Sequence, residues 1–171
     1  MNLTQGTLHV YTYKDGLLAR LAHDLRLKLE RFELKADGTK LSATFYADSL
    51  TVEGTVRQGQ LDANELSAKD KDKIRENMRE EVLHTDRHPT ATFQGQATER
   101  GAGRWSVQGE LTLVGKTAPV TFDARLDGGR YVGELELVPS RWGIPPFKAL
   151  GGAIKLQDKL KVAFAFDAPK A

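Results

Sequence analysis

Apolar and polar side chains alternate one by one through most of this chain, and this pattern limits the folds that it can adopt. Between 105 and 113 the odd-numbered residues are mostly apolar and the even-numbered ones are polar. A period of two places successive side chains on opposite faces of a strand, so one face of each strand is buried and the other meets water. The same pattern recurs at 8–13, 25–29, 41–47, 120–126, 131–138 and 160–166.

This strand pattern, together with the turn residues between its segments, gives roughly eight to ten short strands. Antiparallel strands with one apolar face bury that face best by closing into a barrel or by packing as a sandwich. No internal repeat, low-complexity segment or linker divides the chain, which predicts a single domain over residues 1–171. We therefore expect an all-β, antiparallel, up-and-down barrel of about eight strands with one helix.

The alternation changes phase near residue 30. Apolar residues at odd positions in 25–29 give way to Phe32 and Leu34 at even positions. A one-residue slip in a strand that keeps one face buried indicates a bulge or a bend. Just upstream, residues 17–22 are predicted to form a short helical turn.

Residues 67–83 break the strand pattern and are predicted to form the helix. Ser67 is a helix-capping residue, and Asp70 three residues later completes a capping box. One narrow apolar stripe repeats every four residues, while the other faces are charged. This predicts a helix that lies on the surface or plugs an opening. The stripe consists of Ile74, Met78 and Val82.

The letters Gly115-Lys116-Thr117 invite comparison with a phosphate-binding loop. That loop needs a glycine five positions before the second glycine, and Glu110 occupies this position. It also needs a helix to follow, whereas residues 120–126 alternate as a strand. The stretch is therefore interpreted as the turn of a β-hairpin.

Composition and charge exclude several classes of protein. The chain has 171 residues, no cysteine and a net charge of +2 with both signs interspersed, so disulfides and zinc–thiolate sites are excluded and nucleic acid is a disfavoured partner. No run of roughly eighteen apolar residues occurs, so we expect no integral membrane segment. The first residues lack the pattern of a secretory leader, which predicts a cytoplasmic protein, or a periplasmic one if a leader has been removed.

Residue chemistry alone identifies no active site. His84 and His88 are four apart, but no third ligand converges with them in the sequence and Pro89 follows. No Gly-x-Ser-x-Gly nucleophile motif occurs. We therefore expect no metal, no cofactor and no enzymatic activity, and a cavity with an apolar wall is the favoured kind of functional site.

The predicted wall of this cavity consists of large apolar residues on the inner faces of the strands. Gly95, Gly109 and Gly133 fall on the same faces, where they either leave space for a ligand or bend the strands. His23 and Arg141, expected near the barrel ends, complete the candidate binding set. The wall residues are Phe45, Phe93, Trp105, Leu111, Phe122, Tyr131, Leu135, Phe164 and Phe166.

Two alternatives to ligand binding stay open. The first is an enzyme acting on a small apolar substrate, with His23 as acid or base and Arg141 holding an anion. The second is a structural or interaction module with a solid core, for which homodimerisation is a further hypothesis, because small barrels fill easily with side chains.

Several motifs, in this order along nearly the whole chain, resemble those of the YceI-like family. The most specific is Gly-Glu-Leu-Thr-Leu-Val-Gly-Lys-Thr-Ala-Pro-Val at 109–120. The others are Leu-Ala-His-Asp-Leu at 21–25, Phe-Tyr-Ala-Asp-Ser-Leu at 45–50, a helix end leading into Pro-x-x-x-Phe at 83–93, and Ser-Arg-Trp-Gly-Ile at 140–144.

The resemblance implies a lipocalin-like antiparallel barrel with an elongated apolar interior. Some members of that family hold a polyisoprenoid or a related amphiphilic lipid. By this resemblance the expected function is non-enzymatic binding, carriage or sequestration of a polyisoprenoid, an isoprenoid quinone or a similar lipid inside the barrel.

Overall fold

The computed structural model describes residues 1–3, 5–16 and 22–169. The helical turn expected at 17–22 lies almost entirely outside these residues. The strands are β1 (Asn2–Leu3), β2 (Gly6–Lys14), β3 (Leu25–Leu29), β4 (Phe32–Asp37), β5 (Lys40–Tyr46), β6 (Leu50–Arg57), β7 (Gln60–Asp62), β8 (Thr90–Gly101), β9 (Arg104–Leu113), β10 (Lys116–Asp127), β11 (Arg130–Leu137), β12 (Lys148–Ala149) and β13 (Ile154–Asp167). The helical segments are η1 (Ala47–Ser49), α1 (Ala68–Asn77), η2 (Met78–Val82), η3 (Pro139–Trp142) and η4 (Leu150–Gly152).

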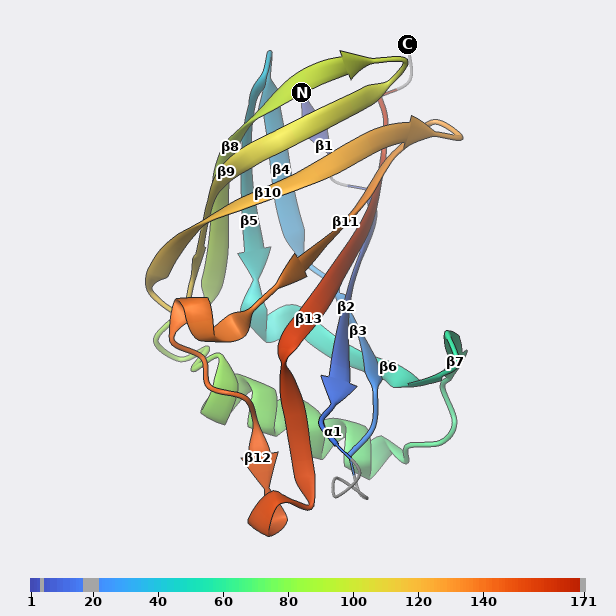
Figure 1. Ribbon diagram of the computed structural model, residues 1–171, viewed down its shortest axis with the longest axis vertical. Helices are drawn as coiled ribbons and strands as arrows, with labels where there is room; N and C mark the ends of the chain where they lie inside the picture. Colours follow the sequence, from blue (N-terminus) through green and yellow to red (C-terminus); the bar gives the residue numbers. More distant parts are fainter. Residues whose placement is uncertain (4, 17–21, 170–171) are drawn as a thin grey trace.

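The strands form one antiparallel sheet that curls around an elongated interior (Figure 1). Their order is β1-β4-β5-β8-β9-β10-β11-β13-β2-β3-β6-β7, and among the described residues it does not return to its first strand. β1 pairs with β4, and β2, next along the chain, pairs with β13 and β3, so consecutive strands lie at distant places in this order. The expected lipocalin-like barrel with one helix is confirmed, and bends divide its wall into more segments than the eight expected.

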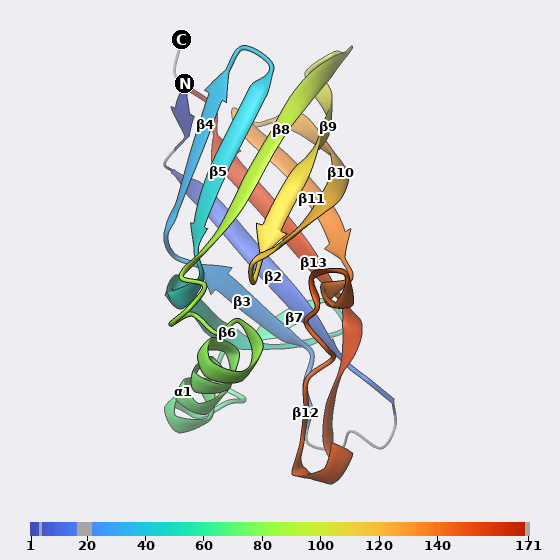
Figure 2. The same cartoon turned by 90° about the vertical axis from the view of Figure 1, so that its left-hand side faces the viewer.

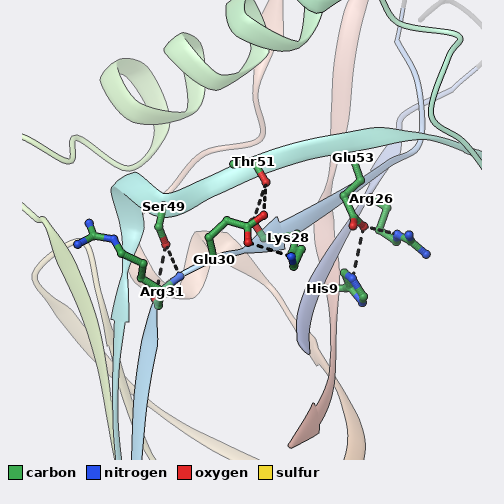
Figure 3. A network of polar contacts seen from close by, with 8 residues as sticks. All are labelled: His9, Arg26, Lys28, Glu30, Arg31, Ser49, Thr51 and Glu53. Atoms are coloured by element: carbon green, nitrogen blue, oxygen red, sulfur yellow. Dashed lines mark hydrogen bonds and ion pairs between the residues drawn. The ribbon is translucent and has the colours of Figure 1, made fainter. Parts of the chain in front are cut away.

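The predicted bend near residue 30 separates β3 from β4. β3 pairs with β2 and β6, whereas β4 pairs with β1 and β5. Buried Ser49 holds the corner: its backbone oxygen accepts from the Glu30 amide at 3.2 Å and its Oγ accepts from the Arg31 amide at 3.0 Å (Figure 3). The phase slip is therefore the point at which one strand leaves one pair of neighbours for another.

The predicted helix is confirmed and lies across one end of the barrel (Figures 1 and 2). Ser67 Oγ accepts from the Asp70 amide at 3.1 Å, and Asp70 accepts from the Ser67 amide at 3.2 Å, which completes the capping box. Val82 and Leu83 at its far end pack against the core cluster around Leu111. The charged helix thus closes the barrel through its last turn.

The Gly-Lys-Thr stretch lies at a two-residue hairpin between β9 and β10. The turn residues are Val114 and Gly115, with φ of 49° and 72°, as a type I′ turn requires. Exposed Lys116 is already the first residue of β10. The turn therefore lies one residue earlier than expected, and a strand follows it where a phosphate-binding loop needs a helix.

The glycines on the inner faces do not leave space for a ligand. Gly95 and Gly109 lie directly opposite each other in β8 and β9. A Cβ on Gly109 would lie 2.4 Å from the Gln94 carbonyl oxygen and 2.6 Å from the ring of Phe93. Phe164 covers Gly133 in the same way: a Cβ placed on Gly133 would lie 2.4 Å from Cζ of the Phe164 ring. The expectation of empty space is wrong, because a neighbouring carbonyl oxygen and an aromatic ring occupy the place that a side chain would take.

A polar network on the outer face joins β2, β3 and β6 (Figure 3). Glu53 Oε2 accepts from Arg26 Nε at 2.5 Å and lies 3.4 Å from His9 Nε2. Burial lowers the pKa of His9 below its ordinary value of 6.5, and the positive charges of Arg26 and Lys28 lower it further. The negative charge of Glu53 raises the pKa but does not outweigh burial. The neutral form of His9 is therefore the one that the fold favours.

The glycine contacts predict that Gly109 tolerates neither a small nor a large side chain. Gly109→Ala and Gly109→Leu should both destabilise the protein, the latter by about 1–3 kcal/mol or more, because both place a Cβ against a fixed carbonyl oxygen. The midpoint of urea unfolding measures this. Gln108→Ala, on the exposed face of the same strand, is the control and should change stability by about 0.5 kcal/mol at most. An unchanged midpoint for Gly109→Ala would contradict the account.

The lowered pKa of His9 predicts a specific pH dependence of stability. Between that pKa and 6.5, the unfolded chain binds more protons at this residue than the folded one, so stability falls as the pH drops through this window. Urea unfolding at about pH 7.5 and about pH 5.5 should show wild type losing more stability on acidification than His9→Gln. If wild type instead gains stability relative to His9→Gln, the ion pair with Glu53 outweighs burial.

Candidate functional site

The interior of the barrel holds a cavity of about 390 Å³, within the usual size range of ligand sites. Leu, Val, Ala, Met, Phe and Gly residues line it, together with Trp105 and Tyr131. Among the described residues, no carboxylate, amine, guanidinium or imidazole side chain lines the cavity. Within this set, the Trp105 indole N–H and the Tyr131 hydroxyl are the polar side-chain groups of the lining.

All of the apolar residues predicted to form a cavity wall do line this space. Gly109 does not, because the ring of Phe93 covers it. Whether these side chains bind a ligand stays a prediction. The lining residues that the sequence had indicated are Phe45, Phe93, Trp105, Leu111, Phe122, Tyr131, Leu135, Phe164 and Phe166.

A continuous belt of aromatic rings crosses the interior. Ring centroids lie 6.0 Å apart for Phe93 and Phe122, 5.6 Å for Phe122 and Phe164, and 5.3 Å for Phe164 and Phe166. Phe32, on the far side of the bend at residue 30, extends the belt at 5.1 Å from Phe166. Rigid rings that support one another keep a wall in place, whereas flexible side chains would collapse into the space. The cavity and its belt disfavour the alternative of a solid core.

The cavity reaches the surface at one end of the barrel. Met1, which is 52% exposed, and exposed Gly38 both line it, so it reaches the surface beside the β4–β5 hairpin. Figures 1 and 2 place the N-terminus, the far end of β13 and the β8–β9 hairpin at this same end, opposite α1. At the α1 end, half-buried Leu83 and Ala47 line the cavity.

A segment that the sequence had not assigned to the core helps to close the wall. β10 pairs with β11 only from Asp123 to Asp127, so the two strands diverge toward the α1 end. Trp142, which is 1% exposed, packs into the cluster beside this gap, and its Nε1 donates to the Leu111 carbonyl oxygen at 2.8 Å. The sequence feature that could have indicated this buried residue is a single tryptophan next to Gly143, between two strand patterns.

Arg141 lies outside the cavity, which corrects its assignment to the binding set. Its side chain is exposed, its Nη2 donates to the Pro119 carbonyl oxygen at 2.9 Å, and its guanidinium lies 5.3 Å from the centroid of the Trp142 ring. Proline fits at position 119 because β10 has no strand partner on that side. Arg141 thus ties η3 to the free edge of β10 and does not face a ligand inside the barrel.

His23 also lies outside the cavity, and it does not meet Arg141. Its Nδ1 is 3.8 Å from Glu65 Oε1, and Glu65 also accepts hydrogen bonds from Thr55 and Arg57. The hydrogen bond from Thr55 is the main cause that lowers the pKa of Glu65, and the charges of Arg57 and His23 act in the same direction. Glu65 is therefore ionised at neutral pH and suits an ion-pair network better than proton donation. The proposed pairing of His23 with Arg141 in catalysis is not supported.

The remaining candidate sites hold no assembled centre. His84 follows the helical segment with φ of 48°, and the ring of His88 lies against Gly115. In residues 1–3, 5–16 and 22–169, no three His, Cys, Asp or Glu side chains come together as metal ligands. None of the helices in this part of the chain is long and apolar enough to cross a membrane.

Solved structures similar to this chain have the same fold at low sequence identity. BcnA of Burkholderia cenocepacia is 15% identical with a TM-score of 0.66, covering 96% of each chain. A polyisoprenoid binding domain from Saccharophagus degradans is 12% identical with a TM-score of 0.61, covering 98% of this chain and 96% of the other. The YCEI protein of Campylobacter jejuni is 12% identical with a TM-score of 0.57, covering 84% and 85%.

Among curated protein sequences, none matches this chain. The model of the YceI-like domain matches residues 21–168, which include the bend, the helix, the aromatic belt and the segment that carries Trp142. With the fold and the comparisons in agreement, the chain belongs to the YceI-like family.

Proposed function

We propose that this protein binds and carries, or sequesters, a long apolar amphiphile such as a polyisoprenoid or an isoprenoid quinone inside its barrel, without transforming it. The observation that carries this proposal is the cavity lining, in which no side chain of the described residues bears a charged or acid–base group other than the Tyr131 phenol. The similar domain from Saccharophagus degradans, described as polyisoprenoid-binding, supports the same class of ligand.

Burial of apolar surface is sufficient for tight binding here. Each methylene removed from water contributes about 0.8 kcal/mol before the costs of binding. A ligand of about forty heavy atoms reaches roughly 0.3 kcal/mol for each atom, which corresponds to nanomolar affinity or better. The elongated cavity therefore needs no polar contact to retain a lipid chain.

The polar atoms of the lining fix an expected orientation for the ligand. Trp105 and Tyr131 meet edge to face with centroids 5.4 Å apart, on strands next to the hairpins of the open end. Neither the indole N–H nor the phenol O–H has a hydrogen-bond partner among the described residues. We expect the polar head of the amphiphile to lie at this end and its tail to point toward Leu83.

Catalysis has little support in this geometry. The acid–base candidates of the sequence, His23 and Arg141, lie outside the cavity in separate networks. An apolar lining without a nucleophile or a paired acid and base can hold a substrate but offers no group to transform it. The cytoplasmic location expected from the sequence stays a prediction, and binding does not depend on it.

The first test is recovery of the lipid. Mass spectrometry of an organic extract of the purified protein should detect an isoprenoid, and a long-tailed isoprenoid quinone added to delipidated protein should raise its melting temperature. If the extract is free of lipid and no isoprenoid raises the melting temperature, the proposal fails.

The second test fills the cavity. Ala97→Phe places a ring on the lined face of β8, and Thr98→Phe places the same ring on its exposed face. Displacing two methylenes removes about 1.6 kcal/mol, so Ala97→Phe should weaken quinone binding more than tenfold. Thr98→Phe should leave it unchanged. Equal affinities for the two variants, measured by fluorescence titration of folded protein, would place the ligand elsewhere.

A further inference from the structure

Arginines gather on the hairpins that surround the open end of the cavity. Arg100 and Arg104 flank the β8–β9 turn, and Arg125 and Arg130 flank the β10–β11 turn. Arg104 and Arg125 lie directly opposite each other on neighbouring strands. Like charges in this position destabilise a sheet, so this pairing contributes nothing to the fold.

Three of these arginines share one groove. A second cavity, of about 560 Å³, is lined by Arg100, Arg104 and Arg125, and it shares Trp105 with the apolar interior. Within the described residues no carboxylate oxygen lies within 4.0 Å of Arg100 or Arg104, whereas Arg125 pairs with Asp127 at 3.3 Å. Guanidinium groups without such partners are suited to bind phosphate oxygens.

The groove also contains negative charge, which limits its attraction for anions. Asp123 and Glu134 line it, and Glu134 pairs with Lys161 at 3.4 Å. Asp123 lies next to the arginine row without an ion pair in the part of the chain that the structure describes. Removing the Asp123 carboxylate should therefore strengthen the binding of an anionic surface to this groove, whereas removing an arginine should weaken it.

An apolar row also reaches solvent at the β10–β11 hairpin. The inner residues of β10 line the cavity up to Ala124, and Leu126 continues the same row beyond it with 46% of its surface exposed. The Leu126 amide donates to the Gly103 carbonyl oxygen at 2.7 Å, which holds the β10–β11 hairpin against the β8–β9 turn. An apolar row that leaves the cavity and enters solvent beside cationic side chains is typical of a surface that sits in a lipid interface.

The opposite end of the barrel offers a rival surface. Leu150, at φ 50°, is 70% exposed at the tip formed by β12 and β13, next to Lys148. Lys155, which lies opposite Lys148 on the neighbouring strand, forms an ion pair with Asp15 at 2.7 Å. At that end half-buried Leu83 lines the cavity, whereas the exposed residues Met1 and Gly38 line it at the other end. The open end is therefore the one that couples a membrane to the interior.

We propose that the open end docks on the surface of an anionic membrane, with the arginines on lipid phosphates and Leu126 in the interface, and that lipid passes there between the bilayer and the cavity. This inference rests on the proposed function for the passage of lipid, but the docking itself is independent of it. The partner is a phospholipid surface, recognised by its phosphates and its apolar layer together.

Vesicle flotation tests the docking. Wild type should float with vesicles of phosphatidylcholine mixed with phosphatidylglycerol, much less with phosphatidylcholine alone, and less as salt is raised. Reversing two charges in Arg100→Glu/Arg104→Glu should weaken association at least about tenfold, and Asp123→Asn should strengthen it by roughly fivefold. Lys148→Glu/Leu150→Asn, at the opposite end, is the matched control and should behave as wild type.

Each remaining outcome separates the two proposals. Leu126→Asn should weaken binding to mixed vesicles and leave binding to soluble heparin unchanged; if it leaves vesicle binding unchanged too, the groove binds polyanions in general and membrane docking is overturned. Equal flotation with both vesicle types, or loss only in the control variant, also overturns it.

Detergent-dispersed quinone should still raise the melting temperature of the arginine variant, while the uptake of quinone from vesicles by this variant should slow. Vesicle binding with the expected pattern but no quinone binding would refute the lipid cavity and leave the docking in place.

Discussion

The contact between the ring of Phe93 and the paired glycines Gly95 and Gly109 sets the shape of the barrel. A Cβ at either glycine would strike a backbone carbonyl oxygen at 2.6 Å or less, so the two strands keep their curvature only while both positions lack a side chain. The ring covers the backbone that the glycines expose, as Phe164 does for Gly133. The same rings then form the belt along the interior, and the volume they leave is the cavity. Bent strands, a rigid wall and an unfilled interior thus depend on one arrangement.

The alternating pattern of the sequence determined the strands, and two local irregularities in it were equally informative. The phase change near Phe32 predicted the bend that Ser49 pins, and the Ser67 capping box predicted where the helix begins. Both features are local, because a pleated strand and a helix start are decided by residues next to each other. The positions of His23 and Arg141 were not predictable in this way. Each lies in a segment between strands whose path depends on contacts with residues far along the chain.

The choice between the two roles left open for the glycines could not be made from the sequence for a related reason. Sequence shows that Gly95 and Gly109 occupy inner positions, but not that they face each other or that one ring covers both. Which residues face each other depends on the register between β8 and β9. The alternating pattern shows on which face of its strand a residue lies, but not which residue of the next strand lies opposite it. The burial of Trp142 was not predicted, because this residue lies outside the alternating strand patterns. It packs beside the gap that forms where β10 and β11 separate. The lining could thus be predicted as a set of side chains, but the free volume between them could not.

In the lipid carrier proposed above, the apolar lining would also constrain how a lipid reaches the cavity. A methylene gains about 0.8 kcal/mol on leaving water, and it gains about the same in a bilayer as in an apolar cavity. Exchange between a membrane and this barrel is therefore close to balanced, while a tail of ten methylenes exposed to water between the two costs roughly 8 kcal/mol. The cavity sets how much lipid is held, and the path of the tail sets how fast it is exchanged. Half-buried Leu83 lines the cavity at the α1 end and exposed Met1 and Gly38 line it at the other, so the proposed path runs through the rim beside Met1 and Gly38. A rim that keeps the tail out of water during transfer would lower the barrier without changing the affinity. In the proposed carrier, the arginines and Leu126 would therefore affect the rate of exchange, and the belt of phenylalanines the capacity for lipid.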